Sequence, residues 1–274
     1  MKNNPIHIII FILFKQAGIP SACFAFFAYF LWGCHPQLVD INLPDYERML
    51  VVEGYLQAGS PPSVLLTESV SYFDNPGLPV VTHATMILTY GNVIDTLKYN
   101  PLAFQYQSNN PLPLLLNTPF RLSVADTLGR SVQAETQFQT LTRIDSLQST
   151  FDDVFQARII VNFKDEESTK DYYRITMYAE VEEEDFSIAQ NDLLINGQNT
   201  AFTTRNRWLN LDTVQVRLYH IGLEWYDFLV SSQKAKVGAH NPLVEPVSVI
   251  SNVVGGKGIF TTLNVDYAEI VIHP

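Results

Sequence analysis

Short apolar segments with a two-residue period recur along most of this chain, and they constrain its fold more than any other feature. Alternate side chains of a β-strand share one face, so such a segment indicates a strand buried on one side. Val132, Ala134, Thr136 and Phe138 share one face in this way. The chain also has 17 Phe and 13 Tyr among 274 residues, and aromatic side chains favour pleated surfaces. The sequence therefore predicts a mainly β protein.

The first half of the chain contains a series of these segments, separated by turn residues such as Asp74-Asn75-Pro76-Gly77. Short strands with frequent turns are typical of an immunoglobulin-like or fibronectin-like β-sandwich, which we predict over residues 47–145. A polar stretch at 143–150 marks its end. The predicted strands are 48–56, 63–69, 80–90, 94–99, 120–125 and 132–138.

The second half, residues 146–274, is predicted to be a second β-rich domain. Segments 157–163 and 172–181 flank a charged loop, and we expect them to form a hairpin. Three later segments alternate in the same way, and we predict strands at 213–221, 258–263 and 265–272.

In one segment of the second half, the spacing of the apolar residues changes from that of a strand to that of a helix. Trp225, Phe228 and Leu229 recur at helical spacing after Gly222. This spacing predicts one short helix near 223–236, with Gly238 placed to end it.

The N-terminus carries an export signal. Two apolar runs, 6–14 and 19–32, are separated by Lys15, and each is shorter than the roughly 20 residues that cross a bilayer. Together they predict a signal peptide over 1–33. Its end, Leu31-Trp32-Gly33-Cys34, matches a bacterial lipobox, in which the cysteine thiol accepts a diacylglyceryl group. We expect lipid attachment at Cys34, followed by a tether over 34–46.

Two alternatives to Cys34 remain open from the sequence alone. Cys23 follows Ser21-Ala22, but Pro20 stands where a lipobox has an aliphatic residue. The other alternative is an uncleaved N-terminal anchor. Cys23 and Cys34 are the only cysteines, so the mature domain is predicted to contain no disulfide.

Charge excludes one class of partner. The formal net charge is −11, and an acidic surface repels phosphate backbones, so we expect no nucleic-acid binding. The acidic residues at 165–171 and 182–185 are predicted to be solvated loops, because they lack the Asp-x-Asp-x-Asp-Gly spacing of a calcium loop.

Motifs for catalysis or cofactor binding are absent from the sequence. The histidines form neither a His-x-x-x-His nor a His-Glu-x-x-His pattern, and no Gly-x-Ser-x-Gly elbow occurs. Glu53, Glu180 and Glu224 lie among apolar residues, and a hydrolase acting on glycans or peptides would have to pair two of them across a cleft. We therefore predict no catalytic residue, metal or cofactor, and keep the hydrolase as an alternative.

Four residues are candidate contacts for a ligand or partner of unknown identity. Trp208, Trp225 and Tyr226 supply aromatic surface, although such residues are more often core. Lys257 lies in the glycine-rich segment 255–258, which lacks Walker spacing and is interpreted as a tight turn with positive φ.

Several segments together resemble Bacteroidota-type envelope lipoproteins of the domain-of-unknown-function family 4249. They include Val39-Asp40-Ile41-Asn42-Leu43-Pro44, Leu50-Val51-Val52-Glu53-Gly54, Tyr226-Asp227-Phe228-Leu229, Ser251-Asn252 and Gly256-Lys257-Gly258-Ile259-Phe260. The resemblance implies an outer-membrane lipoprotein, facing either the periplasm or the exterior. Genes of such proteins commonly lie near those of TonB-dependent outer-membrane receptors, which makes such a receptor the candidate partner. The resemblance brings no catalytic residues. A non-enzymatic accessory or binding protein is therefore the first hypothesis, with a structural or adhesive surface protein as a further alternative.

Overall fold

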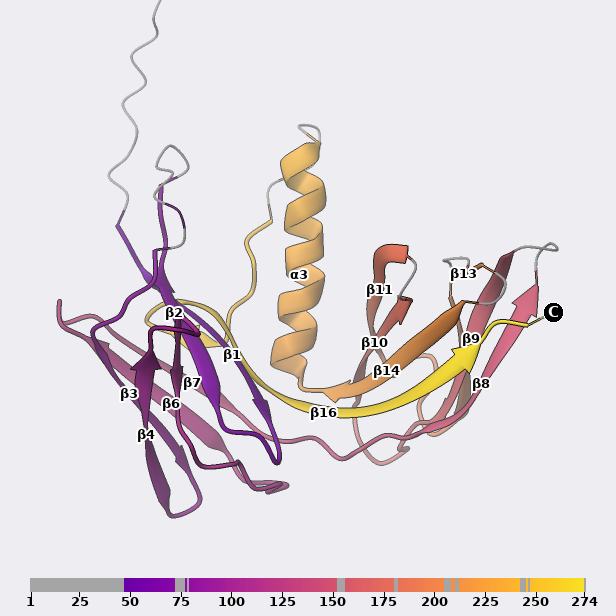
Figure 1. Cartoon of the computed structure of the whole chain (residues 1–274), viewed down its shortest axis with the longest axis horizontal. Helices are drawn as coiled ribbons and strands as arrows, with labels where there is room; N and C mark the ends of the chain where they lie inside the picture. Colours follow the sequence, from indigo (N-terminus) through magenta and orange to yellow (C-terminus); the bar gives the residue numbers. More distant parts are fainter. Residues whose placement is uncertain are drawn as a thin grey trace, which may run out of the picture. The chain divides into compact units, whose positions relative to one another are not determined.

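The computed structural model describes residues 47–71, 77, 79–151, 156–179, 182–204, 208–209, 212–241, 245 and 247–273. The predicted signal peptide, Cys34 and the tether lie outside these residues. The described part is mainly β-sheet with the helix α3 (Leu223–His240), so the predicted fold class is confirmed (Figure 1).

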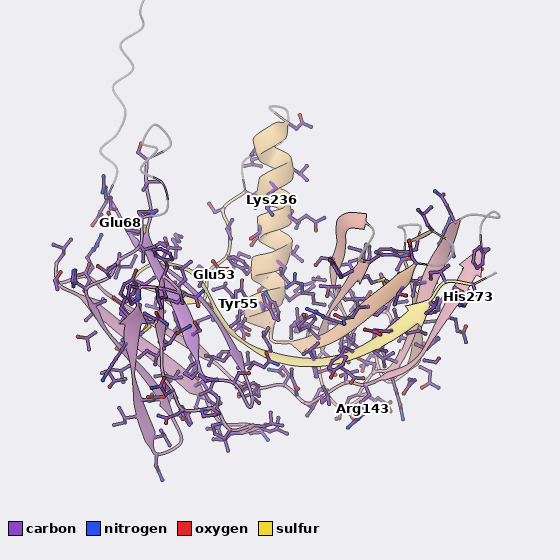
Figure 2. The ribbon with its side chains drawn as sticks, viewed as in Figure 1. Glu53, Tyr55, Glu68, Arg143, Lys236 and His273 are labelled. Atoms are coloured by element: carbon purple, nitrogen blue, oxygen red, sulfur yellow. The ribbon has the colours of Figure 1, made fainter. Side chains whose placement is uncertain are left out.

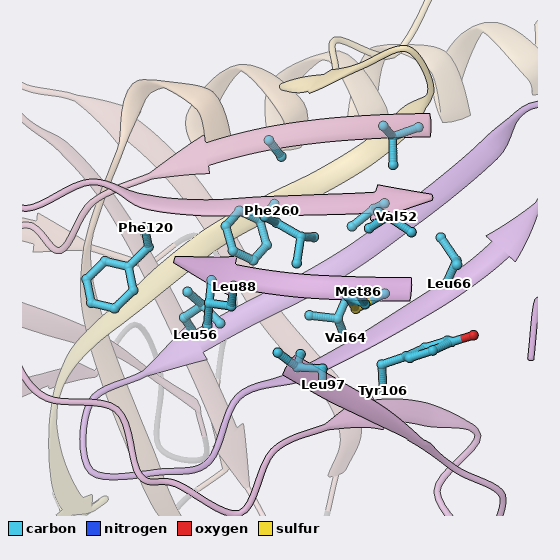
Figure 3. Close-up of a cluster of buried hydrophobic side chains, with 14 of the residues drawn as sticks. Val52, Leu56, Val64, Leu66, Met86, Leu88, Leu97, Tyr106, Phe120 and Phe260 are labelled. Atoms are coloured by element: carbon cyan, nitrogen blue, oxygen red, sulfur yellow. The ribbon is translucent and has the colours of Figure 1, made fainter. Parts of the chain in front are cut away.

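The first half folds as a β-sandwich. One layer contains β1 and β2, the other contains β3, β4, β6 and β7, and β5 joins β2 to β4. Alternate side chains of both layers meet in a single core, among them Val52, Val64, Met86 and Phe120 (Figure 3). The bounds are β1 (Leu50–Gln57), β2 (Ser63–Glu68), β3 (Ala84–Tyr90), β4 (Val93–Asn100), β5 (Gln105–Gln107), β6 (Phe120–Asp126) and β7 (Ser131–Thr136).

The second half has its own two layers and its own core. In one layer β9 pairs with β8, β12 and β13, and in the other β10 lies between β11 and β14. Buried residues such as Ile159, Phe163, Ile175 and Val216 fill the space between them. The bounds are β8 (Ile144–Phe151), β9 (Gln156–Lys164), β10 (Tyr172–Ala179), β11 (Glu182–Asn191), β12 (Asn199–Thr203), β13 (Trp208–Leu209) and β14 (Thr213–Ile221).

Two expectations about this half are wrong. Segments 157–163 and 172–181 do not form a hairpin, because β9 and β10 belong to different sheets and face each other across the core. Alternation shows which face of a strand is buried, but not which strand lies beside it. The acidic segment 182–185 is also not a loop, since it opens the edge strand β11.

One long strand, β16 (Lys257–Val271), belongs to both halves (Figure 1). Its first part, up to Leu263, pairs in parallel with β1, and its second part, from Asn264, pairs antiparallel with β14. The sequence predicted two strands that separate at this point, but the chain continues without a break and only the pairing partner changes. Because of β16, and because β15 (Val253–Val254) pairs with β7, the first sandwich also includes residues from the C-terminal region.

The parallel pairing of β1 with β16 requires a close backbone approach. Gly258 has a φ of +116°, and a Cβ there would lie 1.9 Å from the carbonyl oxygen of Val52. Asn252 fixes the preceding loop, since its side chain accepts the N–H of Phe260 and donates to the Phe260 carbonyl. Gly255 also has a positive φ, as the predicted tight turn requires.

Helix α3 packs on the side of the shared sheet that faces away from both cores. Trp225 is buried there with Tyr172, Ile221 and Ile259, so the helix contacts strands of both halves. The helix is longer than predicted. Gly238 lies inside it, and the N–H of Asn241 donates to the Gly238 carbonyl at its end.

We predict that Gly258→Ala destabilises the protein by at least about 3 kcal/mol, because the new Cβ would force β16 away from β1. Gly129→Ala is the matched control: it shares a positive φ (+83°), but a Cβ at this position would have no other atom within 4 Å. Its cost is expected to be about 1–2 kcal/mol, from the left-handed backbone alone. Chemical denaturation measures both. Equal losses would show that the close approach does not limit stability.

Candidate functional site

The outer face of the shared sheet carries an aromatic cluster around Trp225. The ring of Trp225 lies 5.7 Å from that of Tyr55 on β1 and 5.8 Å from that of Tyr219 on β14, measured between centroids. The guanidinium carbon of Arg174 lies 5.2 Å from the Trp225 ring centroid and 5.8 Å from that of Tyr219, within the range of cation–π attraction. We call Tyr55, Arg174, Tyr219 and Trp225 the junction cluster.

Tyr55 faces the helix together with Glu53. Their side chains project from β1 on the side away from the sandwich core, and Figure 2 shows both beside α3. Burial and the negative charge of Glu53 raise the pKa of Tyr55 to about 12, while the positive charge of Arg174 opposes this shift. Tyr55 is therefore an uncharged hydrogen-bond donor at neutral pH.

A groove of about 490 Å³ lies between α3, β1 and the start of β16. We call it the helix groove; its lining includes Val51, Tyr55, Phe228, Val249 and Lys257. Most of these side chains are apolar, with Glu53 and Lys257 as the charged groups at its wall. Such a mixture suits an apolar ligand group or peptide segment that is oriented by a few polar contacts.

One wall of the helix groove is the extended segment that includes 247–251. The hydroxyl of Ser231 on α3 accepts the N–H of Ile250 at 2.9 Å and donates to the Asp227 carbonyl at 2.6 Å. Ser231 is itself buried. This bond fixes the segment against the helix without burying its apolar side chains.

Four apolar side chains on and just beyond this wall face solvent. Ile250 is 51% exposed and Val254 is 74% exposed, and Val247 and Val249 are also exposed. We call these four residues the apolar edge. Single exposed apolar residues are ordinary, but a run of them beside a groove is typical of a surface that contacts a partner.

A second candidate is a buried acidic network in the second half. Asp165, Asp171 and Asp192 present carboxylate oxygens within 4.8 Å of one another, a spacing that suits a cation. Protein donors already bond to these carboxylates. Asp165 accepts from the Tyr173 hydroxyl at 2.6 Å and from the Gly197 N–H at 2.8 Å, and Asp192 accepts from the Asp171 N–H at 2.9 Å.

His220 connects this network to the segment between the two halves. Its Nε2 lies 3.0 Å from a carboxylate oxygen of Asp171, and its Nδ1 lies 2.8 Å from the carbonyl oxygen of Thr140. A ring that donates from Nε2 to Asp171 can accept the Thr140 hydroxyl at Nδ1, 3.3 Å away. The other Asp171 oxygen accepts from Thr169 at 2.7 Å. Burial and the hydrogen bond to Asp165 raise the pKa of Tyr173, which keeps its hydroxyl protonated as a donor. We assign this network a structural role.

Of the three acids considered for a hydrolase, the two that the structure describes, Glu53 and Glu224, are not paired. Glu53 lines the helix groove, whereas Glu224 lines a different hollow beside Thr136 and Lys170. Glu224 accepts hydrogen bonds from Thr136 at 2.9 Å and from Thr261 at 3.4 Å, which connects the start of α3 to the first sandwich. Glu180 lies outside the described residues.

The four residues predicted as contacts have different surroundings. Trp208 is 1% exposed and belongs to the core of the second half, which corrects its interpretation as a surface contact. Trp225 is equally buried, but it supports the junction cluster. Tyr226 is half-buried, 4.8 Å from the ring of Tyr172, and Lys257 is exposed at the helix groove.

Sequence reasoning missed Ser231, Ile250 and Arg174. Ser231 shares the helix with the predicted Trp225, but its role depends on a segment distant in sequence.

Within the described residues, no helix combines the length and hydropathy needed to cross a bilayer.

Comparisons with known proteins give a family and distant structural neighbours. A family model described as Domain of unknown function (DUF4249) matches residues 37–268. A search of curated proteins finds no match. A two-domain fibronectin type III segment of chicken tenascin is 8% identical with a TM-score of 0.24, covering 64% of this chain and 91% of that one. The FN1–FN3 domains of chicken CNTN1 are 8% identical with a TM-score of 0.29, covering 81% and 63%.

We predict that His220→Ala lowers the free energy of unfolding by about 1–3 kcal/mol, because it leaves the buried Asp171 carboxylate without one of its hydrogen-bond donors. His83→Ala is the control, since His83 is exposed, and its effect should stay within about 0.5 kcal/mol. Urea denaturation at neutral pH measures both variants. Similar stabilities would contradict a structural role for this buried hydrogen bond.

Proposed function

Because the chain belongs to the DUF4249 family, we propose that it is a membrane-anchored envelope lipoprotein of the Bacteroidota type that binds a partner and catalyses no reaction. The predicted signal peptide and the lipobox ending at Cys34 support the anchor. The family match begins at residue 37, directly beyond Cys34, so the matched region corresponds to the chain that export would leave.

The apolar edge is the observation that carries the binding proposal. Ile250 is 51% exposed in the segment that Ser231 fixes at the wall of the helix groove, and Val254, which is 74% exposed, follows that segment in the chain. Burying such side chains against a partner removes them from water, which favours association roughly in proportion to the apolar area that is buried. The separation of Glu53 from Glu224 favours binding over hydrolysis.

The proposed partner is a TonB-dependent receptor of the outer membrane. A lipid at Cys34 would hold this protein on the same membrane as the receptor, which raises the effective concentration of each near the other. An interface of modest affinity then suffices for a stable complex.

We expect Cys34→Ala to abolish lipid attachment. The unaltered protein from isolated outer membranes should have the mass of a chain that starts at Cys34 plus a diacylglyceryl group, and the variant should lack this modification. Intact-mass spectrometry of membrane and soluble fractions gives the answer. An unmodified chain that retains Met1, or a soluble one cleaved elsewhere, would refute the anchor, and a lipid at Cys23 would refute the assignment to Cys34.

A double substitution, Ile250→Asp with Val254→Asp, tests the binding surface. We expect it to weaken receptor binding by about tenfold or more, since it places charges where the partner buries apolar groups. Leu102→Asp is the control, because Leu102 is 92% exposed on the turn between β4 and β5. Quantitative co-purification of the receptor after cross-linking measures the effect. Equal recovery from all three proteins would exclude the apolar edge as the contact.

A further inference from the structure

A shallow hollow of about 350 Å³ lies on the outer face of β10, β11 and β14. Its polar lining comes from three strands and contains two arginines but, among the described residues, no carboxylate. We call it the arginine hollow; its lining includes Arg174, Thr176, Ser187, Gln215, Arg217 and Tyr219.

Arg174 is held in place by its neighbours. It is half-buried, and its guanidinium lies against the rings of Trp225 and Tyr219. Its Nε donates to the hydroxyl of Ser187 at 3.2 Å. These contacts fix the plane of the guanidinium before any ligand arrives, which reduces the entropy lost on binding.

Arg217 lies beside Arg174 on the neighbouring strand. Arg174 is opposite Tyr219 in the β10–β14 pairing, and Arg217 is opposite Thr176, so the two arginines occupy the same face. The Nε and Nη2 of Arg217 both donate to the Gln215 side-chain oxygen, at 3.0 and 2.6 Å. Arg217 is exposed and oriented by this contact.

Neither arginine has an acidic partner among the described residues, in a chain with 28 acidic and 17 basic residues. Other arginines of the protein do have one. Arg121 pairs with Glu135 at 2.6 Å, and Arg130 pairs with Asp126 at 2.7 Å and with Glu68 at 3.0 Å. Glu269 is connected to Arg217 only through Gln215, whose side-chain nitrogen donates to it at 3.3 Å. Two adjacent cations that no carboxylate contacts directly, in an acidic protein, point to an anion that comes from outside.

We propose that the arginine hollow binds a compact ligand with a single carboxylate, of the chemical class of an acidic monosaccharide. The planar guanidinium fork matches a carboxylate through two parallel hydrogen bonds. The hydroxyls of Thr176 and Ser187 provide polar contacts for sugar hydroxyls, and Tyr219 provides an aromatic face. The net charge of −11 disfavours an extended polyanion, so the ligand is small and carries little charge.

The proposal does not depend on the lipid anchor or on the receptor. It is tested by isothermal titration calorimetry of the full chain in detergent, with glucuronate, glucose and inorganic phosphate as the titrants. We expect millimolar affinity for glucuronate, weakened by added salt, and no binding of glucose. No heat with glucuronate up to tens of millimolar, or phosphate binding as tightly as glucuronate, would overturn the proposal.

Matched variants locate the binding. Arg217→Gln should weaken glucuronate binding by about tenfold, because it removes one charge-assisted contact, and Arg174→Lys should weaken it by keeping the charge but losing the fork. Arg121→Gln is the control, since it removes an exposed arginine elsewhere and should leave affinity unchanged. Thermal melting confirms that each variant is folded. Unchanged affinity in Arg217→Gln, or equal loss in Arg121→Gln, would place the binding elsewhere.

Discussion

The parallel pairing of β1 with β16 is the contact on which the rest of the structure depends. It requires the backbone of Gly258 to approach the carbonyl of Val52 more closely than any side chain permits. Once β16 is placed there, Phe260 completes the first core and the strand continues into the second half to pair with β14. The segment between the halves is bound along β16, since the side chains of Thr262 and Asn264 donate hydrogen bonds to the carbonyls of Gln137 and Gln139.

A sheet shared in this way leaves one continuous outer face where the two halves meet, and α3 covers its centre. The helix buries Trp225 there and leaves a hollow on either side, one toward β1 and one toward β10 and β14. The helix groove depends on the shared strand, since β1 and β16 both line it, whereas the arginine hollow is lined by β10, β11 and β14. Separate domains on a flexible linker would not place side chains from β1, β14 and α3 around one indole ring.

The sequence predicts what depends on local pattern. Alternation located β1, β2, β6 and β14 closely, and the change of period located α3. It missed β8, because that strand carries few buried apolar residues, and it paired β9 with β10, because strands facing each other across a core have the same pattern as strands side by side. Lys257 and Trp225 were found as candidates from composition. Arg174 and Arg217 were not, since they become neighbours only through the β10–β14 register.

Trp225 shows why burial and function need not exclude each other on this surface. Its side chain is 1% exposed and contacts no ligand directly. The same ring packs against Tyr55, which lines the helix groove, and beneath Arg174, which lines the arginine hollow. A buried aromatic ring has few accessible rotamers, so it holds both neighbours in one orientation. The aromatic content predicts Trp225 as a contact residue, whereas the structure shows it packed against the two residues that line the candidate surfaces, Tyr55 and Arg174.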